Sequence, residues 1–76
     1  MSGRPKKRSL TLRGHRTSVS LEDAFWQEFR RIAADKDTAI NAMAAEIDAK
    51  RELDVGLASA IRLFVLEDLK AKVAAE

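Results

Sequence analysis

The stretch Arg16-Thr17-Ser18-Val19-Ser20-Leu21 alternates between polar side chains and apolar or β-branched ones, and this alternation decides the fold. A period of two predicts a β-strand with one apolar and one polar face. The polar face carries Arg16, Ser18 and Ser20. Because the backbone of a lone strand needs hydrogen-bond partners, we predict that the same stretch of a second chain pairs with it. The result would be an antiparallel two-stranded ribbon across a twofold axis.

Residues 9–13 also alternate and form a weaker strand candidate. Their apolar members, Leu10 and Leu12, are even-numbered, whereas those of the first stretch are odd-numbered. We therefore expect a bulge or break at Gly14, where the inward face switches.

Basic charge is concentrated at the start of the chain. Six basic residues and no acidic one occur up to Arg16, and the remainder holds eight basic and twelve acidic residues. We expect residues 1–14 to be a flexible basic arm and residues 15–76 to be the folded domain. Such an arm indicates a polyanionic partner, with a solvated disordered tail as the alternative. The candidate phosphate-binding side chains of the arm are Lys6, Lys7, Arg8 and Arg13.

Helical periodicity predicts three helices, over residues 22–36, 38–52 and 57–74. Glu22 or Asp23 is expected to cap the first helix. Trp26, at the edge of its apolar stripe, is interpreted as a core residue rather than a stacking platform for bases. The third helix has so wide an apolar arc that we expect it at a subunit interface. The predicted dimer core comprises Val19, Leu21, Phe25, Phe29, Ile61 and Val65.

The start of the second helix has two interpretations that stay open here. Asp37 or Thr38 caps the helix, or the backbone amides near residues 38–41 bind a phosphate.

Several classes of function find no support in the composition. The chain has no cysteine and one histidine, which argues against disulfides, thiol catalysis and zinc sites. It shows no constellation of acid, base and nucleophile, so we expect no enzyme, and we expect no cofactor. Neither a signal peptide nor a membrane-spanning run is recognisable, which favours a cytoplasmic protein.

The run from Arg16 to Trp26, followed by Ile32-Ala33 and by Thr38-Ala39-Ile40-Asn41-Ala42-Met43, resembles the bacterial and phage ribbon-helix-helix repressors of the Arc and MetJ type. With Ser59-Ala60-Ile61-Arg62, the chain is similar to an alphaproteobacterial variant that has an added third helix. The resemblance implies a mainly α, intertwined homodimer whose ribbon enters the DNA major groove. Helix 38–52 or helix 57–74 would be the family's second helix.

By this resemblance, Arg16, Ser18 and Ser20 would read bases, and the backbone amides of Thr38, Ala39 and Ile40 would clamp a phosphate. The implied function is a sequence-specific transcriptional regulator of bacteria, most simply a repressor. The alternatives are a protein-interaction module, such as the antitoxin partner of a toxin, and a non-specific nucleoid-type DNA binder.

Overall fold

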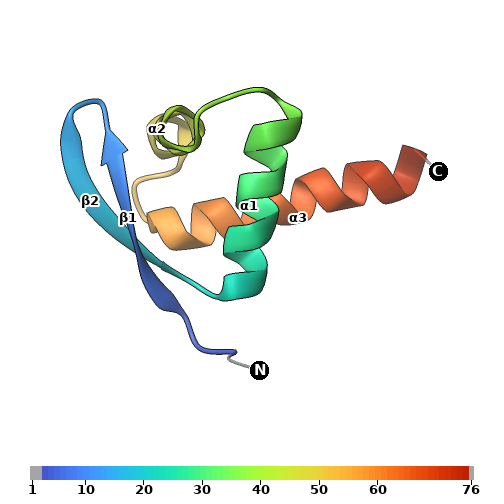
Figure 1. The fold of residues 1–76 in the computed structure, drawn as a ribbon, viewed down its shortest axis with the longest axis horizontal. Coiled ribbons are helices and arrows are strands. Elements are labelled where there is room, and N and C mark those ends of the chain that lie inside the picture. Colours follow the sequence, from blue (N-terminus) through green and yellow to red (C-terminus); the bar gives the residue numbers. More distant parts are fainter. Residues whose placement is uncertain (1–2, 76) are drawn as a thin grey trace.

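The computed structural model describes residues 3–75. A β-hairpin comes first, followed by three helices (Figure 1). The elements are β1 (Lys6–Leu12), β2 (His15–Leu21), α1 (Asp23–Asp35), α2 (Ile40–Lys50) and α3 (Leu57–Ala75). The prediction of a mainly α chain with an N-terminal ribbon and three helices is therefore confirmed.

The hairpin differs from the predicted ribbon in where its second strand comes from. β2 pairs antiparallel with β1 of its own chain, from Lys6 opposite Leu21 to Leu12 opposite His15. The connection is only two residues long, and both Arg13 and Gly14 have positive φ angles, as a type I′ turn requires. Pairing across so short a turn costs little chain entropy, so the strand needs no second chain as partner.

Two further predictions are corrected by this register. The change of parity at Gly14 is real, but it marks a turn and not a bulge, because even-numbered residues of β1 face odd-numbered residues of β2. The expectation of a flexible arm over residues 1–14 is wrong for Lys6–Leu12, which form β1. Residues 1 and 2 lie outside the described residues.

One core joins the hairpin to all three helices. Its buried residues are Leu10, Val19, Leu21, Phe29, Ile32, Ala33, Met43, Ala44, Ile61 and Val65. The rings of Phe29 and Phe64 meet edge to face, 6.1 Å apart, which ties α1 to α3. Trp26 is partly buried against the same core, in agreement with its interpretation as a core residue.

The junction between α1 and α2 explains why α2 begins later than predicted. The Thr38 amide donates to the Ala33 carbonyl (2.9 Å), and the Asp37 amide donates to the Ala34 carbonyl (3.1 Å). Together with the positive φ of Asp37, this pattern is a Schellman motif closing α1. Ala39 is then the N-cap residue of α2, and it makes no side-chain capping bond.

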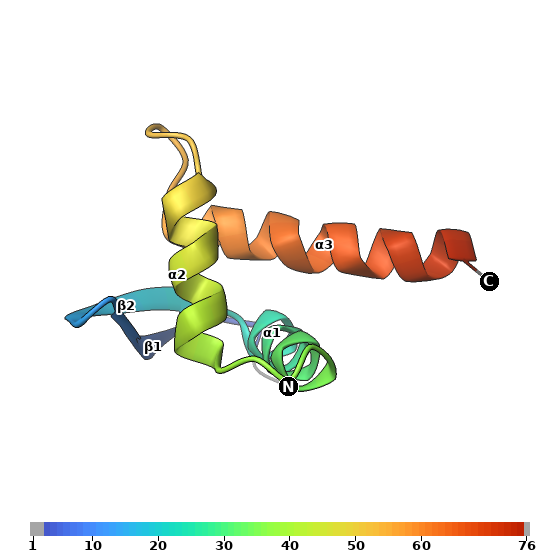
Figure 2. The same cartoon turned by 90° about the horizontal axis from the view of Figure 1, so that it is seen from above.

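α3 is longer than the body it packs against. Its first half lies on the core through Ile61 and Val65, while its second half extends past the other helices (Figure 2). Leu66, Leu69 and Val73 on this extension are exposed by 48, 37 and 70%. The extension therefore carries an apolar surface that the chain itself does not cover.

Candidate nucleic-acid interface

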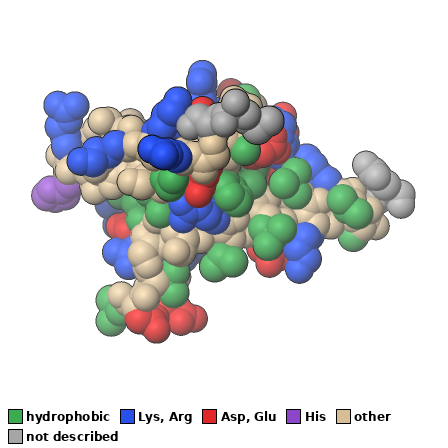
Figure 3. All heavy atoms as spheres, turned by 90° about the horizontal axis from the view of Figure 1, so that it is seen from below, with side chains coloured by type: hydrophobic (Ala, Val, Ile, Leu, Met, Phe, Trp, Pro, Cys, Tyr) green, Lys and Arg blue, Asp and Glu red, His purple; other side chains and the backbone are tan. Residues whose placement is uncertain are grey.

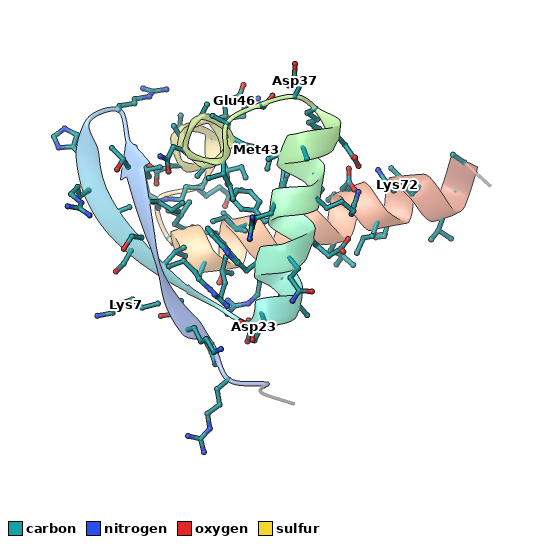
Figure 4. All side chains as sticks on the ribbon, in the orientation of Figure 1. Lys7, Asp23, Asp37, Met43, Glu46 and Lys72 are labelled. Atoms are coloured by element: carbon teal, nitrogen blue, oxygen red, sulfur yellow. The ribbon has the colours of Figure 1, made fainter. Side chains whose placement is uncertain are left out.

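The hairpin has two chemically different faces. Arg8, Leu10, Val19 and Leu21 are turned towards the helices. The opposite face consists of Lys7, Ser9, Thr11, Arg16, Ser18 and Ser20, all exposed. Every side chain of this outer face can donate a hydrogen bond, and two are cations. Lys7 points away from the helices (Figure 4).

The predicted base-reading residues Arg16, Ser18 and Ser20 lie together on this outer face, in alternate positions of β2. Of their neighbours on β1, sequence reasoning assigned Lys7 to phosphate binding and missed Ser9 and Thr11. The register places Lys7 opposite Ser20, Ser9 opposite Ser18 and Thr11 opposite Arg16. The alternation of residues 9–13 was the signal for Ser9 and Thr11, once the turn at Gly14 reverses the chain.

The predicted phosphate-binding cations fall into two groups. Lys7 and Arg13 are exposed and have no acidic partner among residues 3–75, whereas Arg8 and the exposed Lys6 both pair with Asp23 at the start of α1. The Arg8 guanidinium also donates to the Leu21 carbonyl (3.3 Å) and lies 5.4 Å from the centre of the Trp26 ring. The pKa of Asp23 is lowered, first by Arg8 and then by Lys6. Arg8 therefore fixes the hairpin to α1, and its side chain is not in a position to bind a DNA phosphate.

A second arginine holds the other strand at the same end of the hairpin. Arg62 of α3 bonds Glu22 through Nε (3.0 Å) and Nη2 (2.8 Å), and Nη2 also reaches the Ser20 carbonyl (3.2 Å). Its guanidinium lies 5.7 Å from the centre of the Phe25 ring. A backbone hydrogen bond and then Arg62 lower the pKa of Glu22. Glu22 thus binds Arg62 and does not cap α1 with its side chain, as the sequence had suggested it could.

The start of α2 lies beside the tip of the hairpin. Asn41 Oδ1 accepts a hydrogen bond from the Thr11 amide (3.1 Å). The first bond of the α2 ladder is donated by Met43 to the Ala39 carbonyl, so the amides of Ile40 and Asn41 precede that ladder. The Thr38 amide is occupied by Ala33, and the prediction that it clamps a phosphate is wrong. The Thr38 hydroxyl bonds the Lys36 carbonyl, so it does not cap α2 either.

Comparison with known protein families identifies the same architecture. A model of the "Ribbon-helix-helix domain" family matches residues 5–69. The chain belongs to the ribbon-helix-helix family. No curated protein and no solved structure gives a significant match. The family's fold is a regulatory DNA-binding one and is generally not enzymatic. In this ribbon-helix-helix domain the matched region includes β1, α2 and the part of α3 up to residue 69, so the boundary expected after residue 14 falls inside it.

The residues predicted for the dimer core of this ribbon-helix-helix chain are used within one chain. Val19, Leu21, Phe29, Ile61 and Val65 are buried there, and Phe25 packs against them. They are therefore not a surface for a second copy in this conformation. The exposed apolar side chains of α3 are the remaining candidates for a surface that contacts a second copy.

Basic side chains occur on both the hairpin and the helices of this ribbon-helix-helix domain. On the face shown in Figure 3, several Lys and Arg side chains lie over the hairpin, and others are scattered over the helices. Among residues 3–75, no group of three His, Cys, Asp or Glu side chains is arranged to hold a metal ion. No helix in the same range has the length and apolar character needed to cross a membrane.

Proposed function

We propose that this ribbon-helix-helix domain is a sequence-specific DNA-binding transcriptional regulator that inserts its hairpin into the major groove. The observation that carries the proposal is the outer face of the hairpin, where hydroxyl groups and cations stand exposed without an acidic neighbour. The major groove, about 12 Å wide, admits a two-stranded ribbon. Arginine bonds guanine there, and serine bonds several base edges.

Phosphate contacts would flank the ribbon. Lys7 and Arg13 are the exposed cations of the predicted set that have no acidic partner among residues 3–75. The amides of Ala39 and Ile40 lie at the start of α2, which the bond from Thr11 to Asn41 places beside the hairpin tip. A helix N-terminus binds phosphate through such amides and its dipole. These contacts would set the orientation of the hairpin, and the outer face would supply base preference.

Selection of binding sites from random duplexes tests the proposal directly. We expect the wild-type protein to enrich a defined sequence, and Arg16→Ala to relax the preference at one base position, at a cost of roughly 1–3 kcal/mol. Arg30→Ala is the matched control, because Arg30 is also an exposed arginine but lies on α1. Enrichment of no sequence by a protein that binds DNA would instead favour the nucleoid-type alternative.

We further propose that the regulator acts as a homodimer through the exposed stripe of α3, formed by Leu66, Leu69 and Val73. Their spacing of three and four residues places them on one side of the helix. A pair of such stripes in antiparallel helices would remove apolar surface from water on both copies. The double substitution Leu66→Lys/Leu69→Lys should yield a folded monomer, measured by sedimentation equilibrium. Leu53→Lys, at a fully exposed loop position, is the control.

The same stripe supports the second candidate function, a protein-interaction module of the antitoxin kind. If the wild-type protein sediments as a monomer and the double substitution changes nothing, the stripe does not serve a second copy. The binding partner of the stripe would then be a different protein. A dimer that the lysines disrupt argues for self-association.

A further inference from the structure

We propose that β1 reads bases together with β2, so that a single chain presents a complete two-stranded ribbon, with Ser9 and Thr11 as additional specificity-determining residues. The inference rests on the proposed DNA binding. It departs from a ribbon built from two chains, in which only Arg16, Ser18 and Ser20 would face the bases.

The register of the hairpin supplies the first step. Each reader of β2 has a polar side chain of β1 directly opposite: Lys7 for Ser20, Ser9 for Ser18 and Thr11 for Arg16. Residues opposite one another in antiparallel strands have Cβ atoms about 4.5–5.5 Å apart. The side chains of both strands therefore reach the same height above the sheet, and a groove that admits one row admits the other.

The dimensions of the groove supply the second step. Two neighbouring strands lie about 4.8 Å apart, well within a groove about 12 Å wide. If β2 paired with β2 of a second copy while keeping β1, the sheet would have four strands spanning about 14 Å. Such a sheet is wider than the groove. Because β1 is already paired to β2 within the chain, the hairpin alone is the unit that fits.

The hairpin is also held by its own chain. Arg8 fixes β1 to Asp23, and Arg62 fixes the Ser20 end of β2 to α3. Towards the tip, the Thr11 amide of β1 donates to Asn41 of α2. On β2, Thr17 is exposed beside a hollow lined by Ala45, Ala49 and Leu57. The hairpin is therefore attached to all three helices, through Asp23 of α1, Asn41 of α2 and Arg62 of α3, and its outer face is held in position for entry into a groove.

The length of the outer face predicts the footprint. The outermost readers of β2, Arg16 and Ser20, are four residues apart, which corresponds to about 13–14 Å along the strand. At about 3.4 Å per base pair, one chain should discriminate roughly four base pairs.

Site selection with matched variants tests the inference. Ser9→Ala and Thr11→Val should each change the preferred base at a position inside this footprint, with about 3- to 10-fold weaker binding to the wild-type site, as expected for one lost hydrogen bond. Thr17→Val is the control for Thr11→Val, because Thr17 is an exposed threonine of the same hairpin on the inner face. It should leave the selected sequence unchanged.

Two results would overturn the inference. One is that Ser18→Ala and Arg16→Ala change the selected sequence while Ser9→Ala and Thr11→Val leave it intact, which would indicate a ribbon made by β2 strands of two chains. The other is that a monomeric variant, Leu66→Lys/Leu69→Lys, loses all base preference on a duplex carrying one footprint. If the wild-type protein itself selects no sequence, the proposed function fails, and that outcome is separate from both.

Discussion

Neutralising the exposed cations of the hairpin should flatten the salt dependence of DNA binding by a calculable amount. Each phosphate neutralised contributes about 0.9 to the slope of log K against log salt concentration. Lys7 and Arg13 are exposed and have no acidic partner among residues 3–75. The variant Lys7→Gln/Arg13→Gln should therefore reduce the slope by about 1.8 per bound chain. Between 50 and 200 mM salt, the wild-type protein should lose about 12-fold more affinity than the variant.

Lys6 is the control that makes this measurement specific to the structure. It is adjacent to Lys7 in the chain but lies on the other face, where its Nζ is 3.3 Å from Asp23. Lys6→Gln removes the same charge, yet it should leave the slope nearly unchanged. Fluorescence anisotropy with one labelled duplex over a range of salt concentrations measures all three proteins.

A Lys6→Gln variant that flattens the slope as much, per charge removed, as Lys7→Gln/Arg13→Gln would refute the assignment of faces. It would mean that binding depends on the total charge of the N-terminal segment. A double variant with the wild-type slope would remove Lys7 and Arg13 from the interface altogether. Substitutions are preferable to deleting residues 1–8, because such a deletion would remove part of β1.

Further predictions concern stability. Phe29→Ala should cost about 3–5 kcal/mol, since Phe29 is fully buried, and a denaturation midpoint close to wild type would contradict its place in the core. Val19→Asp should abolish the fold, because it buries an unpaired charge; a native circular dichroism spectrum would contradict this. The lowered pKa of Asp23 implies a stabilisation that is complete above its unfolded value of 3.8 and is lost as the pH falls through the lower folded value. The Tm difference between wild type and Asp23→Asn should accordingly be present at pH 7 and shrink in acid; a difference that grows in acid would refute the assignment. Asp68→Asn should behave likewise, because Arg31 lowers the pKa of Asp68.

The local patterns of the sequence were sufficient for the elements and for one row of the candidate interface. Period-two alternation located β2 and the exposed positions of Arg16, Ser18 and Ser20. Helical periodicity located the three helices, although α2 begins two residues later than predicted because the Schellman motif uses Thr38. The switch from even-numbered to odd-numbered apolar positions at Gly14 follows from the pairing of the two strands in the hairpin. Only its interpretation as a bulge was wrong.

Contacts between distant residues were beyond the reach of such patterns. Arg8 and Asp23 are separated by 15 positions, and Glu22 and Arg62 by 40. A run of basic residues looks uniform in a sequence. No local pattern distinguishes an arginine that pairs with a carboxylate from a lysine that is exposed to solvent. The strand register makes that separation, since it turns Arg8 inward and Lys7 outward.

Arg8 and Arg62 connect the stability of the fold to DNA recognition. Each is bound to a carboxylate at the beginning of α1 and also to a backbone carbonyl near the end of β2, at Leu21 or Ser20. Loss of either contact would let the hairpin move relative to the helices without removing any side chain from its outer face. A mobile ribbon loses conformational entropy when it enters the groove. Loss of an Arg8 or Arg62 contact should therefore weaken binding to all sequences and leave base preference intact. Loss of an outer-face hydroxyl should do the opposite, which is how an anchoring residue can be told from a reading residue.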